Sequence, residues 1–344
     1  MRVTFVLPGA GPSGGVRVAA TVANGLLERS HQVRLLIYRG EAGLRSMVRT
    51  TLTKLCYPRT SNWLSRFRGV KELFGDIRRC KFCDGEILVA VGLWCCREIS
   101  RLSLDGIKKV HYIHGISPQE PELMRQAWSE NVPKIGVSSY LVDEVRRVCG
   151  QKLFAVVPNG VDTGEYFPSV PENERDGVGT IYANAYHKDP ATTLAALEEL
   201  RKRCPAVPQR VFGPRRRPVR IPRSVYVQLP SVEQAREMYS RSRVWFMASC
   251  SEGFAVPVLE AMACGCVVVA TDCGGPSDVI TSGKNGFLVE VGDVKKIVDR
   301  IELLLRDDEL RRKMVGNSLS TVHKFTWQNT IDKLEAALLA IAGA

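Results

Sequence analysis

The sequence predicts an α/β protein made of two Rossmann-like domains, each a doubly wound parallel sheet. Its 344 residues exceed what one hydrophobic core usually holds and suit two domains. In both halves, short runs rich in β-branched residues alternate with segments of helical periodicity, which favours parallel strands joined by helical crossovers. The composition, 45% apolar and 24% charged, is that of a globular protein and excludes collagen, a coiled coil and a disordered chain.

The first half contains a series of predicted strands. Each is a short apolar run bounded by turn-forming residues. Between the first two strands, apolar residues from Val16 to Leu27 recur at helical spacing, which predicts the first crossover helix. The predicted strands are 3–7, 33–37, 87–91, 110–113, 135–137 and 154–157.

The second half repeats this alternation of strands and helices, so it predicts a second parallel sheet. Two segments near the end of the chain, 308–321 and 327–342, have helical periodicity and are predicted to close the fold. The predicted strands are 180–182, 211–212, 225–229, 244–247 and 267–270.

A domain boundary is expected near residues 160–175, where the turn-forming Pro158, Asn159 and Gly160 precede a polar stretch without apolar periodicity. We therefore predict an N-terminal domain, 1–165, a C-terminal domain, 166–325, and a C-terminal helix, 326–344, that packs back toward the N-terminal domain. Two such domains facing a central cleft would place ligands at the carboxyl ends of the strands that line it.

Basic residues outnumber acidic ones by 48 to 36, which gives a formal net charge of +12. The stretch from Arg45 to Lys71 carries seven basic side chains and no acid, interleaved with apolar residues such as Trp63, Leu64 and Phe67. Such a stretch favours an anionic partner. Either it lies on an anionic membrane surface, or it is a solvated rim.

The cysteines and the N-terminus indicate a cytoplasmic protein. The 11 cysteines are odd in number and irregularly spaced, and include the adjacent Cys95 and Cys96, which favours reduced thiols. Residues 1–7 run directly into Pro8 and a glycine-rich loop, so no signal peptide is expected. No apolar run is long enough to span a membrane. We expect the protein in the cytoplasm, at most peripheral to the inner face of the membrane.

A glycine-rich loop follows the first strand. Residues 9–14 have the G-x-G-x-x-G spacing of a dinucleotide site. Such a site needs a carboxylate at the end of the second strand to bind the ribose, and Tyr38 lies there instead. Arg39 could still bind the 2′-phosphate of NADP. Dinucleotide binding is therefore disfavoured. The alternatives are that Gly14 and Gly15 bring helix N-terminal N–H groups to a diphosphate, or that the loop is a simple strand-to-helix turn.

The segment 251–265 carries the densest chemical signal. Pro257 suits the first turn of a helix, so the preceding loop has unpaired N–H groups that form an anion site. Glu252 and Glu260 flank this loop, and each carboxylate can accept hydroxyl groups. The combination suits a nucleotide sugar, which has hydroxyls at both ends and phosphate between them. A plainer alternative makes Glu260 a charge that stabilises the helix dipole and Glu252 a solvated loop residue.

This segment resembles the hallmark of the retaining family-4 glycosyltransferases of the GT-B fold, in which a Glu, seven residues and a second Glu follow in order. The resemblance covers nearly the whole chain. It implies transfer of a sugar from a nucleoside-diphosphate sugar to a hydroxyl acceptor with retention of configuration, without a cofactor. The acceptor would be a glycan, a lipid-linked molecule or a natural product. The resemblance also implies that 1–165 is the acceptor domain and 166–325 the donor domain. Further matching stretches are Gly14-Gly15, Val137-Ser138-Ser139, 157–162, Gly274-Gly275-Pro276, 285–289 and Phe325-Thr326-Trp327.

The resemblance also implies roles for individual residues. Glu260 would bind the nucleotide ribose and Glu252 the transferred sugar. The backbone of Gly253, Phe254 and Ala255 would hold sugar hydroxyls or phosphate.

In the first domain, the resemblance implies that Gly14 and Gly15 meet the diphosphate and that His114 lies beside the sugar as a catalytic residue. His111 alternates to the other face of its strand and is expected to be packing.

One position departs from the family pattern. The family commonly has an arginine and, five residues later, a lysine that both contact phosphate; here Lys188 matches, and the arginine position is Ala183. Losing a cation weakens stabilisation of the leaving diphosphate. Asn184, His187 or an arginine of 215–217 could replace it.

No catalytic metal is expected, because no Asp-x-Asp pair lies beside a predicted strand and Asp307-Asp308 is in a surface stretch linked to a helix. A zinc site from Cys80-x-x-Cys83 with the adjacent pair Cys95 and Cys96 is disfavoured, because the adjacent pair cannot easily turn inward together.

Two rival functions remain open. A basic nucleic-acid-binding protein would explain the charge but leaves Glu252 and Glu260 unexplained, because phosphate backbones repel carboxylates. We therefore expect no nucleic acid as partner. A GT-B epimerase or phosphorylase would keep the fold and change the reaction. The donor base, the sugar and the acceptor are not specified by these patterns.

Overall fold

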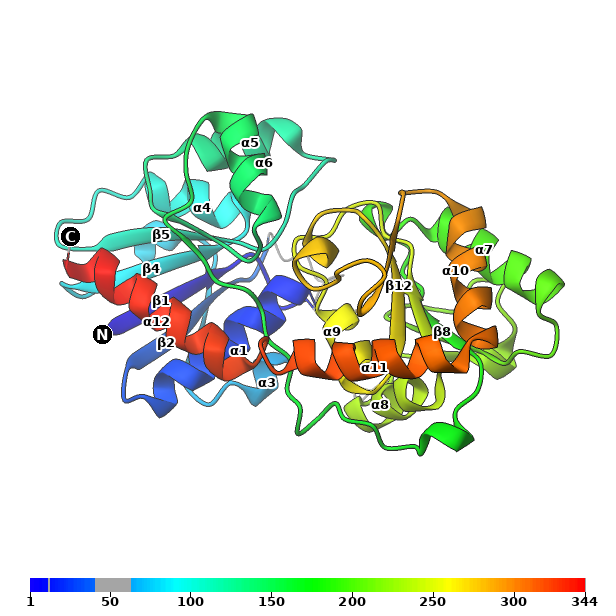
Figure 1. The fold of residues 1–344 in the computed structure, drawn as a ribbon. Helices are drawn as coiled ribbons and strands as arrows, with labels where there is room; N and C mark the ends of the chain where they lie inside the picture. The colour runs from blue at the N-terminus through cyan, green and yellow to red at the C-terminus, as the bar shows by residue number, and fades with distance from the viewer. Residues whose placement is uncertain (12, 41–62, 344) are drawn as a thin grey trace. The chain divides into compact units, whose positions relative to one another are not determined.

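The computed structural model describes residues 1–11, 13–40 and 63–343, which form two compact units (Figure 1). The first unit contains Met1–Asn159 and Trp327–Ala344, and the second contains Gly160–Thr326. The chain therefore leaves the first unit a few residues before the predicted boundary at 165, and the C-terminal helix belongs to the first unit. The acceptor and donor roles of the two units stay predictions.

The first unit is built on one sheet of seven parallel strands in the order β3-β2-β1-β4-β5-β6-β7. The strands are β1 (Arg2–Leu7), β2 (Gln32–Tyr38), β3 (Val70–Phe74), β4 (Glu86–Val91), β5 (Lys108–Ile113), β6 (Lys134–Gly136) and β7 (Ala155–Val156). The helices are α1 (Gly14–Glu28), α3 (Trp63–Arg66), α4 (Leu93–Ser100), α5 (Pro121–Ser129), α6 (Tyr140–Cys149) and α12 (Trp327–Gly343).

Every strand predicted for this half is present, but β3 is absent from the predicted set. It is an edge strand, and Val70 and Leu73 are 58% and 71% exposed. Because neither face of β3 is buried along its length, its sequence lacks the apolar alternation on which strand prediction depends.

Helix α12 packs against α1, although the two are separated by most of the chain (Figure 1). Gly25 makes the close approach possible, because a β-carbon there would lie 2.1 Å from Cδ1 of Ile331. Arg29 forms ion pairs with Asp332 and Glu335 at the same interface. The C-terminal residues therefore complete the first unit.

The second unit is built on a sheet of six parallel strands in the order β10-β9-β8-β11-β12-β13. The strands are β8 (Val178–Ile181), β9 (Gln209–Gly213), β10 (Tyr226–Gln228), β11 (Val244–Met247), β12 (Val267–Thr271) and β13 (Gly286–Val289). The helices are α7 (Pro190–Arg203), α8 (Val232–Arg241), α9 (Val256–Ala263), α10 (Val294–Arg306) and α11 (Asp308–Val322), with short 3-10 turns at Glu172–Glu174, Tyr186–Lys188, Arg223–Val225 and Gly275–Asp278.

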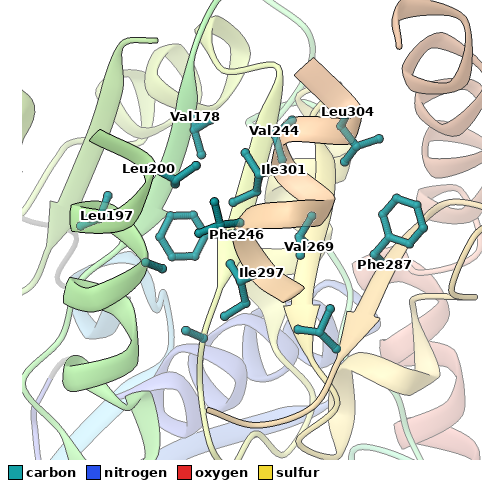
Figure 2. Close-up of a cluster of buried hydrophobic side chains, with 14 of the residues drawn as sticks. Val178, Leu197, Leu200, Val244, Phe246, Val269, Phe287, Ile297, Ile301 and Leu304 are labelled. Carbon is teal, nitrogen blue, oxygen red and sulfur yellow. The ribbon is translucent and has the colours of Figure 1, made fainter. Parts of the chain in front are cut away.

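The core of the second unit lies between the sheet and helices α7 and α10. Figure 2 shows Phe246 of β11 among side chains of both helices, with Ile297 and Ile301 of α10 on one side of it, and these three residues are fully buried. Leu197 and Leu200 of α7 belong to the same cluster. The predicted strands of this half are confirmed with shifted ends, and β13 is an addition.

Both sheets reverse their strand order at one point. In the first unit, β1 pairs with β2 on one side and β4 on the other; in the second, β8 lies between β9 and β11. Ligands of open α/β sheets bind outside the carboxyl ends of strands at such a reversal. The loops after β1, β4, β8 and β11 are therefore the places to look for a site.

The loop after β11 is held by a close backbone approach. A β-carbon on Gly275 would lie 2.3 Å from Cα and 2.4 Å from the backbone nitrogen of Phe254. Gly275 N–H also donates to the carbonyl of Glu252 at 2.8 Å. Only glycine fits at this position.

The basic stretch 45–71 lies partly outside the described residues. Of its apolar members, Leu64 and Phe67 are 7% and 2% exposed, so these two side chains are buried and are not free to enter a membrane. Lys71 Nζ donates to the carbonyls of both. The choice between a membrane surface and a solvated rim stays open. In the part of the chain that is described, none of the helices is long and apolar enough to cross a bilayer.

Replacing Gly275 with alanine is expected to lower the free energy of unfolding by about 1–3 kcal/mol, because the new methyl group meets rigid backbone. Gly316→Ala is the matched control: Gly316 lies in α11, and a β-carbon there meets nothing within 4 Å. This control should gain up to about 1 kcal/mol through helix propensity. Urea unfolding of both variants measures the difference; equal stability would contradict the close approach.

Candidate functional site

Lys188 and Glu252 meet at the strand reversal of the second unit. Lys188 follows β8 and Glu252 follows β11, and Nζ of Lys188 forms an ion pair with Oε1 of Glu252. The side chain of Glu252 is 9% exposed and that of Lys188 is 27% exposed. The alternative of a solvated loop residue at Glu252 is therefore wrong.

Backbone hydrogen bonds hold the two loops together. The carbonyl of His187 accepts from the N–H groups of Cys250 and Ser251 at 3.0 and 3.3 Å. Glu252 N–H donates to the carbonyl of Cys273 at 3.1 Å, which ties the loop to the end of β12. The ion pair therefore rests on a fixed backbone rather than on two mobile side chains.

Ser249 also contacts the carboxylate of Glu252. Its hydroxyl donates to Oε1 at 2.6 Å, and its own carbonyl accepts from the hydroxyl of Thr271. Ser249 and Thr271 are both essentially buried. With Lys188 and Ser249 both on Oε1, the second oxygen of Glu252 has no partner among the described residues and can accept a further hydrogen bond.

The loop between the two acids presents unpaired backbone donors. Within the described residues, the N–H groups of Gly253, Phe254 and Ala255 have no hydrogen-bond acceptor. Ala255 has φ 67° and ψ 59°, a left-handed conformation that is uncommon for a residue with a side chain. Helix α9 begins at the next residue, so these donors lie at the positive end of its dipole. The unpaired donors that the sequence predicts are therefore present, and binding of an anion by them stays a prediction.

Glu260 lies one turn into α9 and is 4% exposed. The hydroxyl of Tyr239 donates to Oε2 of Glu260 at 3.2 Å. Burial and the neighbouring carboxylate raise the pKa of Tyr239 well above its ordinary value, so the phenol stays protonated and can donate.

An aromatic cluster fixes the ring of Tyr239. Its centroid lies 4.3 Å from that of Trp245 and 5.5 Å from that of Phe212, the latter edge-on. Because the ring cannot move, its hydroxyl constrains the rotamer of Glu260. No local sequence pattern signals this contact, since Tyr239 comes from α8.

The candidate residues of the first unit gather at its own strand reversal. Ser13 caps α1 by accepting from Val16 N–H at 3.3 Å, and Gly14 and Gly15 are the first helical residues. The N–H groups of these two glycines have no acceptor among the described residues. The predicted helix N-terminus with free donors is therefore present.

His114 follows β5 and lies beside Gly15. A β-carbon on Gly15 would be 3.4 Å from Cδ2 of His114. Both ring nitrogens are buried and have no partner in the described part of the chain. Burial lowers the pKa of His114 to about 3, so the ring is neutral at physiological pH and can both donate and accept.

His111 occupies the opposite face of β5 and is 1% exposed. Burial, followed by the charge of Lys134, lowers its pKa to about 3. Its place in the interior agrees with the packing role expected from the strand alternation.

Two of the residues that could replace the missing arginine, Asn184 and Arg217, form no hydrogen bond with Lys188 or Glu252. Ala183 follows β8, as expected. Asn184 is exposed and its side chain has no hydrogen bond with the described residues. The guanidinium of Arg217 donates to carbonyls of its own loop, those of Pro218, Val219 and Ile221. The structure thus brings Lys188 to Glu252 but brings neither Asn184 nor Arg217 to them.

The metal candidates do not assemble. Cys95 and Cys96 are both buried in α4, and Cys83 is exposed. Within residues 1–11, 13–40 and 63–343, there is no group of three or more His, Cys, Asp or Glu side chains that could hold a metal ion.

Two family models match the sequence and between them reach both units. The model of "Glycosyltransferase Family 4" matches residues 12–165, and that of "Glycosyl transferases group 1" matches residues 221–320. Among curated proteins, N-acetyl-alpha-D-glucosaminyl L-malate synthase of Bacillus anthracis is 36% identical over 92 residues, which is 27% of this chain and 24% of that protein. D-inositol 3-phosphate glycosyltransferase of Corynebacterium urealyticum is 34% identical over 102 residues, 30% of this chain and 24% of that protein. The matched stretch thus spans about a quarter of the length of these relatives.

Solved structures match over the whole chain. The structure of Anabaena Alr3699/HepE with UDP and glucose has a TM-score of 0.76 at 15% identity and covers 99% of this chain and 100% of that one. S. aureus TarM has a TM-score of 0.72 at 12% identity, covering 100% of this chain and 99% of that one. These likenesses show the fold, which is GT-B, and the two family models show that the chain is similar to the family-4 and group 1 glycosyltransferases over residues 12–165 and 221–320.

Proposed function

We propose that the protein transfers a sugar from a nucleoside-diphosphate sugar to a hydroxyl acceptor, with retention of configuration and without a metal or cofactor. The observation that carries this proposal is the meeting of Lys188 and Glu252 beside the free N–H groups of residues 253–255 at the strand reversal of the second unit. Cation, carboxylate and unpaired amides in one place suit a ligand that is both anionic and rich in hydroxyls.

Each group has a proposed role toward the donor. Glu260, with one oxygen held by Tyr239, accepts hydrogen bonds from the ribose hydroxyls. Glu252, with Oε1 already engaged, accepts from a hydroxyl of the transferred sugar through its other oxygen. The N–H groups of Gly253, Phe254 and Ala255 bind phosphate or sugar oxygens.

In the first unit, we propose that the N–H groups of Gly14 and Gly15 bind phosphate oxygens and that neutral His114 hydrogen-bonds to a sugar hydroxyl. The uncharged imidazole suits this role, because its unpaired ring nitrogens can both donate to and accept from hydroxyls. The identity of the acceptor is not part of this proposal.

During transfer, the bond between the anomeric carbon and the diphosphate oxygen breaks, and a bond to the acceptor oxygen forms. Negative charge then grows on the departing diphosphate. Lys188 and the backbone donors are fixed before the reaction, so they stabilise this charge without reorganisation. With alanine at 183, Lys188 is the cation that we assign to this task.

The nature of the donor is tested first by a thermal-shift screen of uridine, guanosine and adenosine diphosphate sugars. A true donor at 100 times its Kd should stabilise the protein by about 2.7 kcal/mol. UDP and UDP-glucose are included because solved structures of HepE contain them. No stabilisation by any nucleotide sugar or nucleoside diphosphate would contradict the proposal. With a donor in hand, release of free nucleotide without any glycosylated acceptor would favour an epimerase or phosphorylase.

Substitutions of the two carboxylates should affect different steady-state constants. Glu260→Ala is expected to raise the donor KM about 10- to 100-fold, because a charged hydrogen bond to the ribose is lost. Glu252→Ala should instead lower turnover, on the order of 100-fold, because the sugar is no longer positioned and Lys188 loses its partner. Unchanged kinetics in both variants would refute the site.

Tyr239→Phe is expected to weaken binding of the selected nucleoside diphosphate by about 3- to 10-fold, because Glu260 loses the hydrogen bond that fixes its carboxylate. Phenylalanine keeps the aromatic packing, so the fold should persist. Tyr226→Phe is the control: it also removes a phenol hydroxyl, one that donates to the carbonyl of Arg215 at 2.6 Å. Titration calorimetry compares the two, and equal losses would show that the contact with Glu260 is not the cause.

A further inference from the structure

The connection between β9 and β10, residues 214–225, is strongly basic and has no part in the proposed site. We call it the arginine crossover. It contains no α-helix, only the 3-10 turn Arg223–Val225, and several prolines interrupt it. It has no acidic residue and carries five basic side chains: Arg215, Arg216, Arg217, Arg220 and Arg223.

Two anchors fix the backbone of the arginine crossover. Ile221 is 1% exposed and belongs to the core cluster of the second unit. Arg217 donates to three carbonyls of the crossover, and the hydroxyl of Tyr226 donates to the carbonyl of Arg215 at 2.6 Å. The segment therefore has a defined shape that presents its remaining side chains to solvent.

Most of its charge is not neutralised. Arg215, Arg216 and Arg223 are exposed, and none of them has an acidic partner among the described residues. Arg220 pairs with Glu198 at 3.2 Å, but the two side chains are 66% and 44% exposed, so the pair is weakly held. One guanidinium group can donate two parallel hydrogen bonds to the two oxygens of a phosphodiester, whereas the ammonium group of lysine acts as a point charge.

The last turn of α7 extends this surface. Nη1 of Arg201 donates to the carbonyl of Arg220 at 3.5 Å, which places the end of α7 beside the crossover. Helix α7 has 14 residues and begins at Pro190, just after Lys188, so its two ends lie about 20 Å apart. The part of the basic surface around Arg201 and Arg220 is thus far from the start of α7, whereas Arg215 follows β9 at the same carboxyl edge of the sheet as the end of β8.

An apolar side chain projects from the middle of the arginine crossover. Val219 is 92% exposed, more than any other large hydrophobic residue that the structure describes. The crossover has no aromatic residue on which a base could stack, which single-stranded nucleic acids generally require. Arginines around an exposed aliphatic side chain suit a phospholipid surface, where the charges meet phosphates and the aliphatic group enters the interface.

We propose that the arginine crossover is a docking surface for an anionic phospholipid bilayer. Arg215, Arg216 and Arg223 bind lipid phosphates, and Val219 enters the headgroup region. This role goes beyond sugar transfer and does not depend on it. It is also separate from the basic stretch 45–71, most of which lies outside the described residues.

Sedimentation with phospholipid vesicles tests the proposal. The full chain should bind vesicles that contain phosphatidylglycerol at low salt and should not bind phosphatidylcholine vesicles. The variant R215Q/R216Q/R223Q should lose binding by a factor on the order of a hundred, because three surface arginines are removed. Val219→Ser should reduce vesicle binding a few-fold, because it removes the apolar side chain without changing the net charge.

The matched control is K284Q/R312Q/K313Q, which removes three exposed basic side chains elsewhere in the second unit. It should retain most of the binding. Equal loss in both triple variants would mean that net charge alone is responsible, which overturns the proposal. The proposal is also overturned if the wild-type chain does not bind phosphatidylglycerol vesicles. Binding to immobilised single-stranded DNA is measured in parallel. If R215Q/R216Q/R223Q binds the DNA less well than wild type but binds the vesicles equally well, the surface recognises nucleic acid and the proposal is wrong. Thermal unfolding of each variant establishes that it is folded.

Discussion

The ion pair between Lys188 and Glu252 is the interaction around which the second unit is organised. It forms where the strand order reverses, so two loops that leave neighbouring strands in the same direction must meet there. The carbonyl of His187, the hydroxyl of Ser249 and the close approach at Gly275 each restrict one of these loops. The cation is thereby held partly buried and the carboxylate almost fully buried. In such a place the electrostatic interaction of each group with a ligand is stronger than in bulk solvent.

The same arrangement offers a physical reason why a site of the proposed kind could work with alanine at 183. A site that relies on side-chain cations alone would suffer when one is absent, because the desolvated phosphate would lack a counter-charge. Here the unpaired N–H groups of residues 253–255 lie at the start of α9 and carry fixed partial positive charges beside Lys188. Part of the positive potential therefore comes from the main chain, which a point substitution cannot remove.

Sequence patterns predicted much of this architecture for identifiable reasons. Buried parallel strands are continuous apolar runs, so those lining both cores are recognisable, and Pro257 with its flanking glutamates marks the start of α9. Strand β3 was not predictable in this way, because its side chains are exposed. Ser249 and Tyr239 were missed because their roles arise from contacts between elements that only the folded chain brings together. The burial of Leu64 and Phe67 was not predictable either, because the composition of an amphipathic segment does not show which of its apolar side chains pack into a core.

The first unit is assembled from both ends of the chain, with the second unit inserted between them. Helix α12 fills the groove over Gly25 with Ile331, and Arg29 finds its acidic partners only there. During synthesis, the second unit is a continuous segment and can fold as soon as it leaves the ribosome. The first unit is complete only after α12, which ends at Gly343, has been synthesised, and until then the surface of α1 around Gly25 is uncovered. The unit in which the chain begins is thus the last to be completed.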